Sequence, residues 1–275
     1  MSNDTPLPLL VIRLWPKHHN DPALLEELLA ALRRQRACCD EVWLCTEAGF
    51  PALQQHAESA GRMAEAARRF RAKGILAGIQ IANTLGHGDV PVCTEGVDWR
   101  RMVGPDGREA PLCFCPRDGR LHEYLAAMTR LYAAWGPSSI WIDDDLRMHN
   151  HSPVAYGCFC PECLGRFADR QGRTWTAGEL WSALAAPDGG PLRQAWTGFG
   201  QESLAEIARV IAEAAHAVAP LCRMGLQHCG HERGLYEGPV RRAVFGALGA
   251  PTGRPVGSRP GGGFYTDHQP REMLH

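Results

Sequence analysis

The chain has 275 residues, of which 45% are hydrophobic and 21% are charged. This balance excludes a wholly disordered chain, a collagen and a coiled coil, and the length suffices for one large domain. The formal net charge of -1 provides no overall positive field, so we expect neither nucleic acid nor a membrane as a partner. The N-terminus lacks the pattern of a signal peptide and no apolar run approaches a membrane span, which predicts a cytoplasmic protein.

Short apolar runs alternate with longer amphipathic segments along the chain. The runs are typical of buried strands, and the segments carry apolar residues at helical spacing. The predicted strands are residues 9–14, 41–46, 75–82, 139–142 and 223–227, with a weaker sixth at 255–258 joined by Phe264 and Tyr265. The predicted helices are residues 22–36, 56–73, 121–135, 162–185 in broken form, 201–218 and 239–248. Residues 83–118 and the segment after residue 142 are expected to be long loops.

The alternation, with no obvious linker, predicts one α/β domain over residues 1–275 with a parallel sheet. A doubly wound sheet and a (β/α)8 barrel are the two candidate architectures. The first strand runs into Leu14-Trp15-Pro16-Lys17, which lacks the glycines of a dinucleotide-binding turn, and the glycine run at 260–263 lacks the Lys-Ser/Thr of a phosphate loop. Polar and aromatic residues instead gather where strands end, as in a barrel. We therefore predict a TIM-barrel-like fold, incomplete because about six β/α units are visible.

Cysteines form a tight group in the second long loop. Cys158, Cys160 and Cys163 lie within six residues, so a turn can bring their sulfur atoms to one ion. A closed structural zinc site needs four ligands, and an all-sulfur set favours a structural over a catalytic role. Cys115, in a Cys-Pro step, is the best candidate for the fourth ligand. The weaker candidates are Cys113, Cys93 and His151.

The fourth predicted strand runs directly into Asp143, Asp144 and Asp145. Adjacent carboxylates repel and raise one another's pKa, so one of them can stay protonated and serve as a general acid. Two other interpretations remain open: an acidic turn that caps a helix or pairs with Arg147, and a divalent metal site.

These two features together resemble the family 42 glycoside hydrolases, the zinc-containing β-galactosidases. The resemblance rests on the acid-tipped strand, on YGCFCPECLGRF after it, on the upstream Cys-Pro step, and on the helix leading into Gly-Pro-Ser-Ser-Ile-Trp. It covers roughly residues 110–170, where a zinc-binding loop is expected within the barrel. The zinc ligands that the resemblance implies are Cys115, Cys158, Cys160 and Cys163.

The resemblance also implies catalytic roles. The family ends its fourth strand with Asn-Glu, where the Glu is the acid/base, and Asp144-Asp145 stands at the matching place here. Asp145 would therefore be the acid/base, one methylene shorter. The family's nucleophile lies at the end of strand seven, beyond the six strands visible here, so the chain is interpreted as a divergent relative that is truncated at its C-terminus.

Other residues near strand ends are candidates for contact with a carbohydrate substrate. They are polar or aromatic and follow the predicted strands. These candidates are Trp15, Asn83, His228, Arg259 and Tyr265.

The leading functional hypothesis is a retaining glycoside hydrolase, a relative of the β-galactosidases, with structural zinc. The alternative is a non-catalytic carbohydrate-binding relative or an inactive barrel fragment. A third interpretation is a metal-dependent hydrolase that uses Asp143, Asp145 and the nearby histidines. The unpaired edges of the first and sixth strands also make a homo-oligomer possible.

Overall fold

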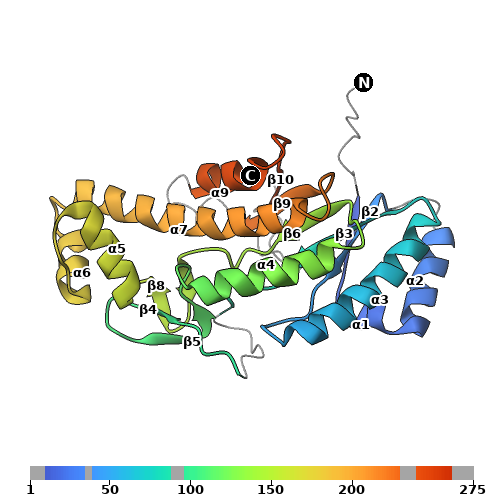
Figure 1. The fold of residues 1–275 in the computed structure, drawn as a ribbon, viewed down its shortest axis with the longest axis horizontal. Helices are drawn as coiled ribbons and strands as arrows, with labels where there is room; N and C mark the ends of the chain where they lie inside the picture. Colours follow the sequence, from blue (N-terminus) through green and yellow to red (C-terminus); the bar gives the residue numbers. More distant parts are fainter. Residues whose placement is uncertain (1–9, 35–38, 88–95, 230–239, 262–275) are drawn as a thin grey trace, which may run out of the picture.

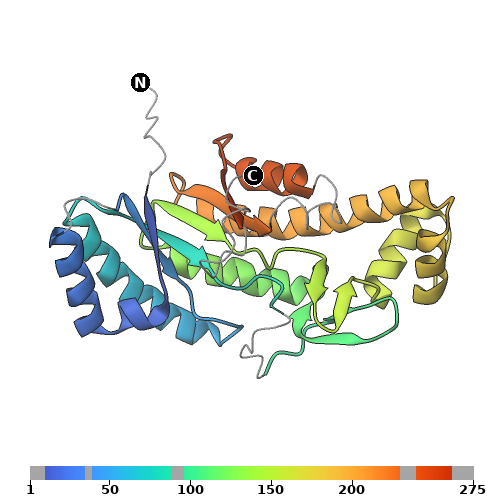
Figure 2. The same cartoon turned by 180° about the vertical axis from the view of Figure 1, so that it is seen from behind.

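The computed structural model describes residues 10–34, 39–87, 96–229 and 240–261. Its main element is one sheet of six parallel strands in the order β1-β2-β3-β6-β9-β10 (Figures 1 and 2). The strands are β1 (Val11–Leu14), β2 (Glu41–Cys45), β3 (Leu76–Ile81), β6 (Ser139–Ile142), β9 (Arg223–Cys229) and β10 (Gly257–Gly261).

Helices connect successive strands of this sheet. They are α2 (Pro22–Arg34), α3 (Leu53–Arg71), α4 (Gly119–Ala133), α7 (Gly190–His216) and α9 (Val240–Gly249), with the short α1 (Pro16–Asn20) after β1. Because each strand pairs with the next one along the chain, the strand order never reverses, which rules out the doubly wound sheet. The described residues form a curled half-barrel sheet, and the prediction of an incomplete (β/α) barrel is confirmed.

The two faces of the sheet differ in composition. Side chains alternate along a strand, so Val42, Leu44, Ile79, Ile140 and Ile142 share one face, where they are buried beneath the helices (Figure 1). The other face, called the inner face below, is the one turned to the viewer in Figure 2. Its residues are Glu41, Trp43 and Cys45 of β2, Gly78 and Gln80 of β3, Ser139 and Trp141 of β6, and Gly225 and Gln227 of β9.

A stacked tryptophan pair fills the middle of the inner face. The rings of Trp43 and Trp141 lie 4.2 Å apart between centroids. The neighbouring strands make room for Trp141 with glycines, since a Cβ at Gly225 would lie 2.4 Å from this ring and one at Gly257 would lie 2.6 Å from it. The inner face can therefore hold this large aromatic pair only because the adjacent positions are glycines, which have no side chain.

A second region extends from the carboxyl ends of the strands. It contains the hairpins β4 (Arg101–Val103) with β5 (Glu109–Phe114) and β7 (His149–His151) with β8 (Val154–Tyr156), followed by α5 (Pro161–Gln171) and α6 (Ala177–Ala185). The prediction of a loop throughout residues 83–118 is therefore wrong where β4 and β5 pair. The helix predicted at 201–218 begins earlier, at Gly190, because Trp196 and Phe199 in its first turns pack against Phe167 of α5.

Among the described residues, no helix combines the length and the apolar composition that a membrane crossing requires.

Candidate active site and metal centre

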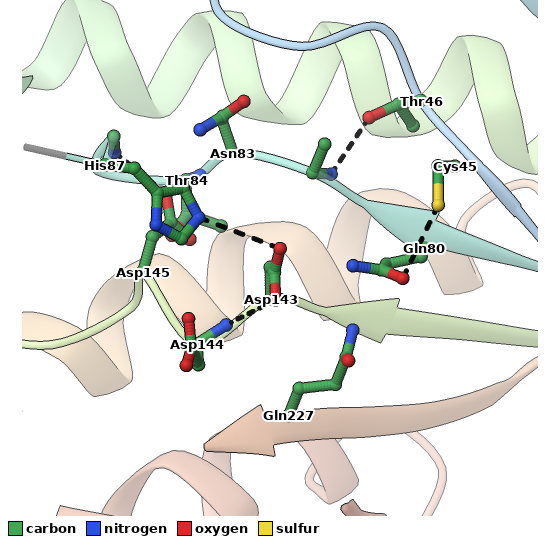
Figure 3. A network of polar contacts seen from close by, with 12 residues as sticks. Cys45, Thr46, Gln80, Asn83, Thr84, His87, Asp143, Asp144, Asp145 and Gln227 are labelled. Atoms are coloured by element: carbon green, nitrogen blue, oxygen red, sulfur yellow. Dashed lines mark hydrogen bonds and ion pairs between the residues drawn. The ribbon is translucent and has the colours of Figure 1, made fainter. Parts of the chain in front are cut away.

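The predicted aspartates follow β6 at the carboxyl end of the sheet. Figure 3 shows them beside residues of the segments that follow β2 and β3 and beside Gln227 of β9. This edge of the sheet is where barrels place their reactive groups. The three aspartates nevertheless have different surroundings.

Asp143 continues the inner face beyond Trp141 and contacts His87. Its Oδ2 lies 3.7 Å from Nε2 of His87, and the two side chains are 15% and 18% exposed. Burial alone would lower the pKa of His87, but the contact with Asp143 and the negative charges of Asp145 and Asp143 outweigh it and raise that pKa to about 9. At neutral pH His87 is therefore an imidazolium held against Asp143. His87 was not among the residues predicted from the sequence, since it lies in an irregular segment between Gly86 and Gly88.

Asp145 is fully buried beneath the segment after β3. Its carboxylate accepts hydrogen bonds from the backbone N–H of Thr84 at 2.6 Å, from the Thr84 hydroxyl at 2.7 Å and from the N–H of Gly86 at 2.8 Å. Burial raises the pKa of Asp145; His87 and Thr84 act in the opposite direction and Asp143 adds to the rise, so the net shift is upward. Asp145 thus holds the chain after β3 in place and is the carboxyl best suited to keep a proton.

Asp144 turns toward Arg147, the residue that the sequence suggested as an ion-pair partner of the acidic turn. Nη1 of Arg147 lies 3.1 Å from Oδ1 of Asp144 and donates to the Asp144 carbonyl at 2.9 Å. The Asp144 side chain remains 32% exposed. Part of the acidic turn is therefore a salt-bridged structural element.

The structure also locates the predicted sugar-contact residues. Trp15 is 41% exposed, with the Arg13 guanidinium 4.5 Å from its ring centroid. Asn83 is buried and its side-chain oxygen accepts from the N–H of Gly49 at 2.7 Å. His228 lies on the helix-covered side of β9, 2.9 Å from the Ser258 hydroxyl. Arg259 is exposed and donates to Gln227 at 2.9 Å, and Tyr265 lies outside the described residues.

Gln80 and Gln227 are polar inner-face residues that the sequence analysis did not single out. Gln80 stands in an otherwise apolar strand and Gln227 follows the apolar run Met224–Leu226, and the neighbours of each on both sides face the helices. A polar residue within a buried strand could have indicated a functional position, but the face of the sheet that such a residue occupies depends on strand register.

Four cysteines converge in the second region. The ligand atoms of Cys115, Cys158, Cys160 and Cys163 all lie within 4.8 Å of one another, and the Cys115 sulfur is 3.5 Å from those of Cys160 and Cys163. Cys115 follows β5, whereas Cys160 precedes the first residue of α5 and Cys163 lies in its first turn. All four are buried, and they are called the four-cysteine cluster below.

The geometry of the four-cysteine cluster suits a metal ion. Tetrahedral coordination with Zn–S bonds of about 2.3 Å places sulfur atoms about 3.8 Å apart, close to the spacing found here. The N–H groups of Val103 and Arg117 point at the sulfurs of Cys158 and Cys115, both at 3.4 Å, as donors that support thiolate charge. Four buried thiols this close cannot all ionise without a cation, and all four are free cysteines rather than members of a disulfide. The buried four-cysteine cluster can bind a metal ion.

The alternative fourth ligands are placed elsewhere. Cys113 donates to the Gly86 carbonyl at 3.3 Å, His151 bonds the Arg147 carbonyl at 2.8 Å, and Cys93 lies outside the described residues. Within the described part of the chain, the four-cysteine cluster is the one group of ligating side chains close enough to hold a metal. The aspartates and nearby histidines do not converge in this way, so the geometry does not support the metal-dependent hydrolase.

The fold is that of an incomplete (β/α) barrel with a polar group of residues at the carboxyl end of its sheet. No protein-family model and no curated protein sequence matches the chain. Among solved structures, it is similar to the β-galactosidase of the haloarchaeon Halorubrum lacusprofundi, with a TM-score of 0.55 and 16% identity over 81% of this chain and 37% of that one. It is also similar to the cold-adapted β-galactosidase of Rahnella sp. R3, with a TM-score of 0.56 and 17% identity over 83% of this chain and 37% of that one. A third similar structure is the β-galactosidase of Bacillus circulans sp. alkalophilus, with a TM-score of 0.57 and 13% identity over 84% of this chain and 38% of that one.

At these identities the likeness establishes the fold alone. The chain spans less than two fifths of the length of each of these β-galactosidases. The barrel that the sequence resemblance implied is confirmed, whereas membership of family 42 itself and the activity are matters for proposal.

Proposed function

We propose that the chain is the barrel, or part of the barrel, of a retaining glycoside hydrolase related to the β-galactosidases. The observation that carries the proposal is the Asp143–His87 pair on the inner face at the carboxyl end of β6, next to a second carboxyl with a raised pKa. Two neighbouring carboxyl groups in unlike environments are what glycosidic bond cleavage uses.

The two carboxyl groups suit different tasks. Asp145 keeps the role that the resemblance gives it, protonation of the leaving oxygen, because its pKa is raised by burial. Its oxygens are covered by Thr84 and Gly86, so proton transfer requires this segment to move away. Asp143 lies beside a charged His87 and faces the substrate, where a carboxylate stabilises a developing oxocarbenium ion.

The proposed metal is zinc, held by Cys115, Cys158, Cys160 and Cys163 in a structural role. An all-thiolate set favours zinc over harder cations, and it leaves no open position for chemistry. When bound, the ion would fix the segments that follow β3 and β6 relative to each other. We further propose one domain over residues 1–275 in a reducing cytoplasmic compartment, where a buried cluster of thiols persists.

One observation favours a second candidate, a carbohydrate-binding protein without turnover. A retaining mechanism needs a second reactive carboxylate, yet β9 and β10 contain no Asp or Glu. Together with the complete enclosure of Asp145, this would leave an inner face that binds sugar without cleaving it.

The experiment that tests the hydrolase proposal is turnover of p-nitrophenyl glycosides by the wild type and by Asp145→Asn and Asp143→Asn. We expect each substitution to lower kcat by at least about 100-fold, the usual contribution of acid–base groups. Asp98→Asn is the matched control, because Asp98 is 80% exposed and pairs with Arg120 away from the site. Undiminished turnover by Asp145→Asn would contradict its role, and absence of turnover by metal-loaded wild type would favour the binding protein.

A further inference from the structure

The inner face carries two buried amide groups that no role described so far explains. Gln80 lies on β3 and Gln227 on β9, the two neighbours of β6, so they flank the strand that leads into Asp143. Their side chains are 0% and 1% exposed. Figure 3 shows both carboxamides directed toward the space in front of Asp143.

A neighbour on the far side fixes the orientation of each amide. The Cys45 thiol donates to Oε1 of Gln80 at 3.5 Å, and Nη1 of Arg259 donates to Oε1 of Gln227 at 2.9 Å. With each oxygen engaged, each NH2 group must point the other way, toward the middle of the inner face. Neither Nε2 has a hydrogen-bond partner among the residues that the structure describes. A buried donor without an acceptor is costly, so two of them on either side of one carboxylate indicate a missing acceptor-bearing ligand.

The floor of this space is aromatic. Trp141 is paired in register with Gln80 and lies one inner-face position before Asp143, and Trp43, stacked on it, lies one inner-face position closer to the amino ends than Gln80. Within the described part of the chain, the indole N–H of Trp43 also lacks a partner. A wide apolar surface beneath hydrogen-bonding groups suits a ring with a C–H face and hydroxyls on its edge.

We propose that Gln80 and Gln227 bind two hydroxyl oxygens of a single neutral sugar ring, with Asp143 accepting from a hydroxyl between them. The inference rests on the proposed function for the location of the site and deepens it by naming two residues that determine specificity. A hydroxyl can accept from an amide and donate to a carboxylate at once. A sugar acid would instead set a second carboxyl group against that of Asp143, and an apolar ligand would leave both amides unpaired.

The test replaces each amide by a side chain of similar shape without donors. We expect Gln80→Met and Gln227→Met each to weaken the affinity for methyl β-D-galactopyranoside, β-D-glucopyranoside or β-D-xylopyranoside, whichever the wild type binds by calorimetry, roughly tenfold. The melting temperature of the free protein should stay the same or rise, because an unpaired donor is removed. Thr129→Val is the matched control: its hydroxyl on α4 is buried and, among the described residues, also unpartnered, but it lies outside the inner face.

The outcomes separate this inference from the proposed function. Unchanged affinity in both methionine variants overturns the inference, even if the wild type hydrolyses glycosides. Failure of the wild type to bind any of the three glycosides overturns it as well. Tenfold losses in a protein that turns over no glycoside support the sugar site and contradict the hydrolase.

Discussion

The two ends of the inner face differ in how completely their polar groups are paired. At the amino ends of the strands, the buried carboxylate of Glu41 accepts from the hydroxyls of Ser138 and Ser139 and pairs with Arg223 at 3.3 Å. At the carboxyl ends, by contrast, the Nε2 atoms of Gln80 and Gln227 have no partner among the described residues.

This difference indicates that the amino end of the inner face stabilises the fold and that the carboxyl end is where a ligand binds. A network with every member satisfied rigidifies the fold, whereas unpaired buried donors lower stability unless a ligand completes them. Barrels in general place stabilising groups at the amino end and reactive groups at the carboxyl end. The predictions below alter one end at a time, from the largest expected effect to the smallest.

Loss of the metal should have the largest effect and should act on the carboxyl end. The four-cysteine cluster anchors the segment after β3, since the Phe114 N–H bonds the Leu85 carbonyl at 2.8 Å and the Gly86 N–H bonds Asp145. We expect Cys160→Ser or chelation to release about one zinc per chain and to cost several kcal/mol, on the order of 10 °C in melting temperature.

Cys113→Ser is the control for the metal experiment, because Cys113 is buried close by but bonds Gly86 rather than the cluster. It should keep the zinc. Protein that is free of zinc after gentle purification, yet equally stable with and without added zinc, would contradict the assignment of the cluster.

Breaking the network at the amino end should be the next largest effect. Glu41→Leu leaves Arg223 without its buried partner, and we expect a loss of about 3–5 kcal/mol in urea unfolding. Glu26→Gln should cost less than about 1 kcal/mol, because the ion pair of Glu26 with Arg69 is exposed. A small effect at Glu41 would mean that the amino end is not the stabilising end.

The Asp143–His87 pair should make stability depend on pH. The pKa of His87 is about 9 in the fold against 6.5 for an ordinary histidine, so its contribution is complete below pH 6.5 and is lost as pH rises through 9. The full loss amounts to about 3 kcal/mol. Urea unfolding at pH 6 and pH 9.5 measures it, and His87→Gln should remove this part of the dependence; an identical profile in the variant would refute the pair.

The tryptophan floor can be tested with two glycines. A Cβ at Gly225 would lie 2.4 Å from Trp141, so Gly225→Ala should destabilise by about 1–3 kcal/mol. Gly246 in α9 has nothing within 4 Å of such a Cβ, and Gly246→Ala should be neutral or stabilising by about 0.5–1 kcal/mol. Equal effects of the two substitutions would mean that the packing around Trp141 is loose.

Sequence patterns predicted the elements whose periodicity is local. The strand at 139–142 was placed at its observed bounds, and the six strand runs and the helices between them lie close to the observed elements. Hairpins β4–β5 and β7–β8 were not predicted, because their strands are short, lie among Gly and Pro residues and show no local periodicity. The first turns of α7 were not predicted, because they lack a repeating apolar stripe. Trp196 and Phe199 in these turns pack instead against Phe167 of α5.

The site was predictable to the extent that its residues are adjacent in sequence. Cys158, Cys160 and Cys163 stand together, and the Cys-Pro step identified Cys115. His87 and the two glutamines could not be found in this way, because their proximity to Asp143 depends on the register of β3, β6 and β9.

The central claim, that the carboxyl end of the inner face is where a glycoside binds, is tested most directly by hydrogen exchange. The Asp145→Asn protein, which we expect to bind without turnover, would be compared with and without p-nitrophenyl β-D-galactoside. We expect added protection in segments 80–87, 141–147 and 225–229, and none in 39–42 or 221–223. Protection at the amino ends, or none anywhere under saturating glycoside, would contradict the account.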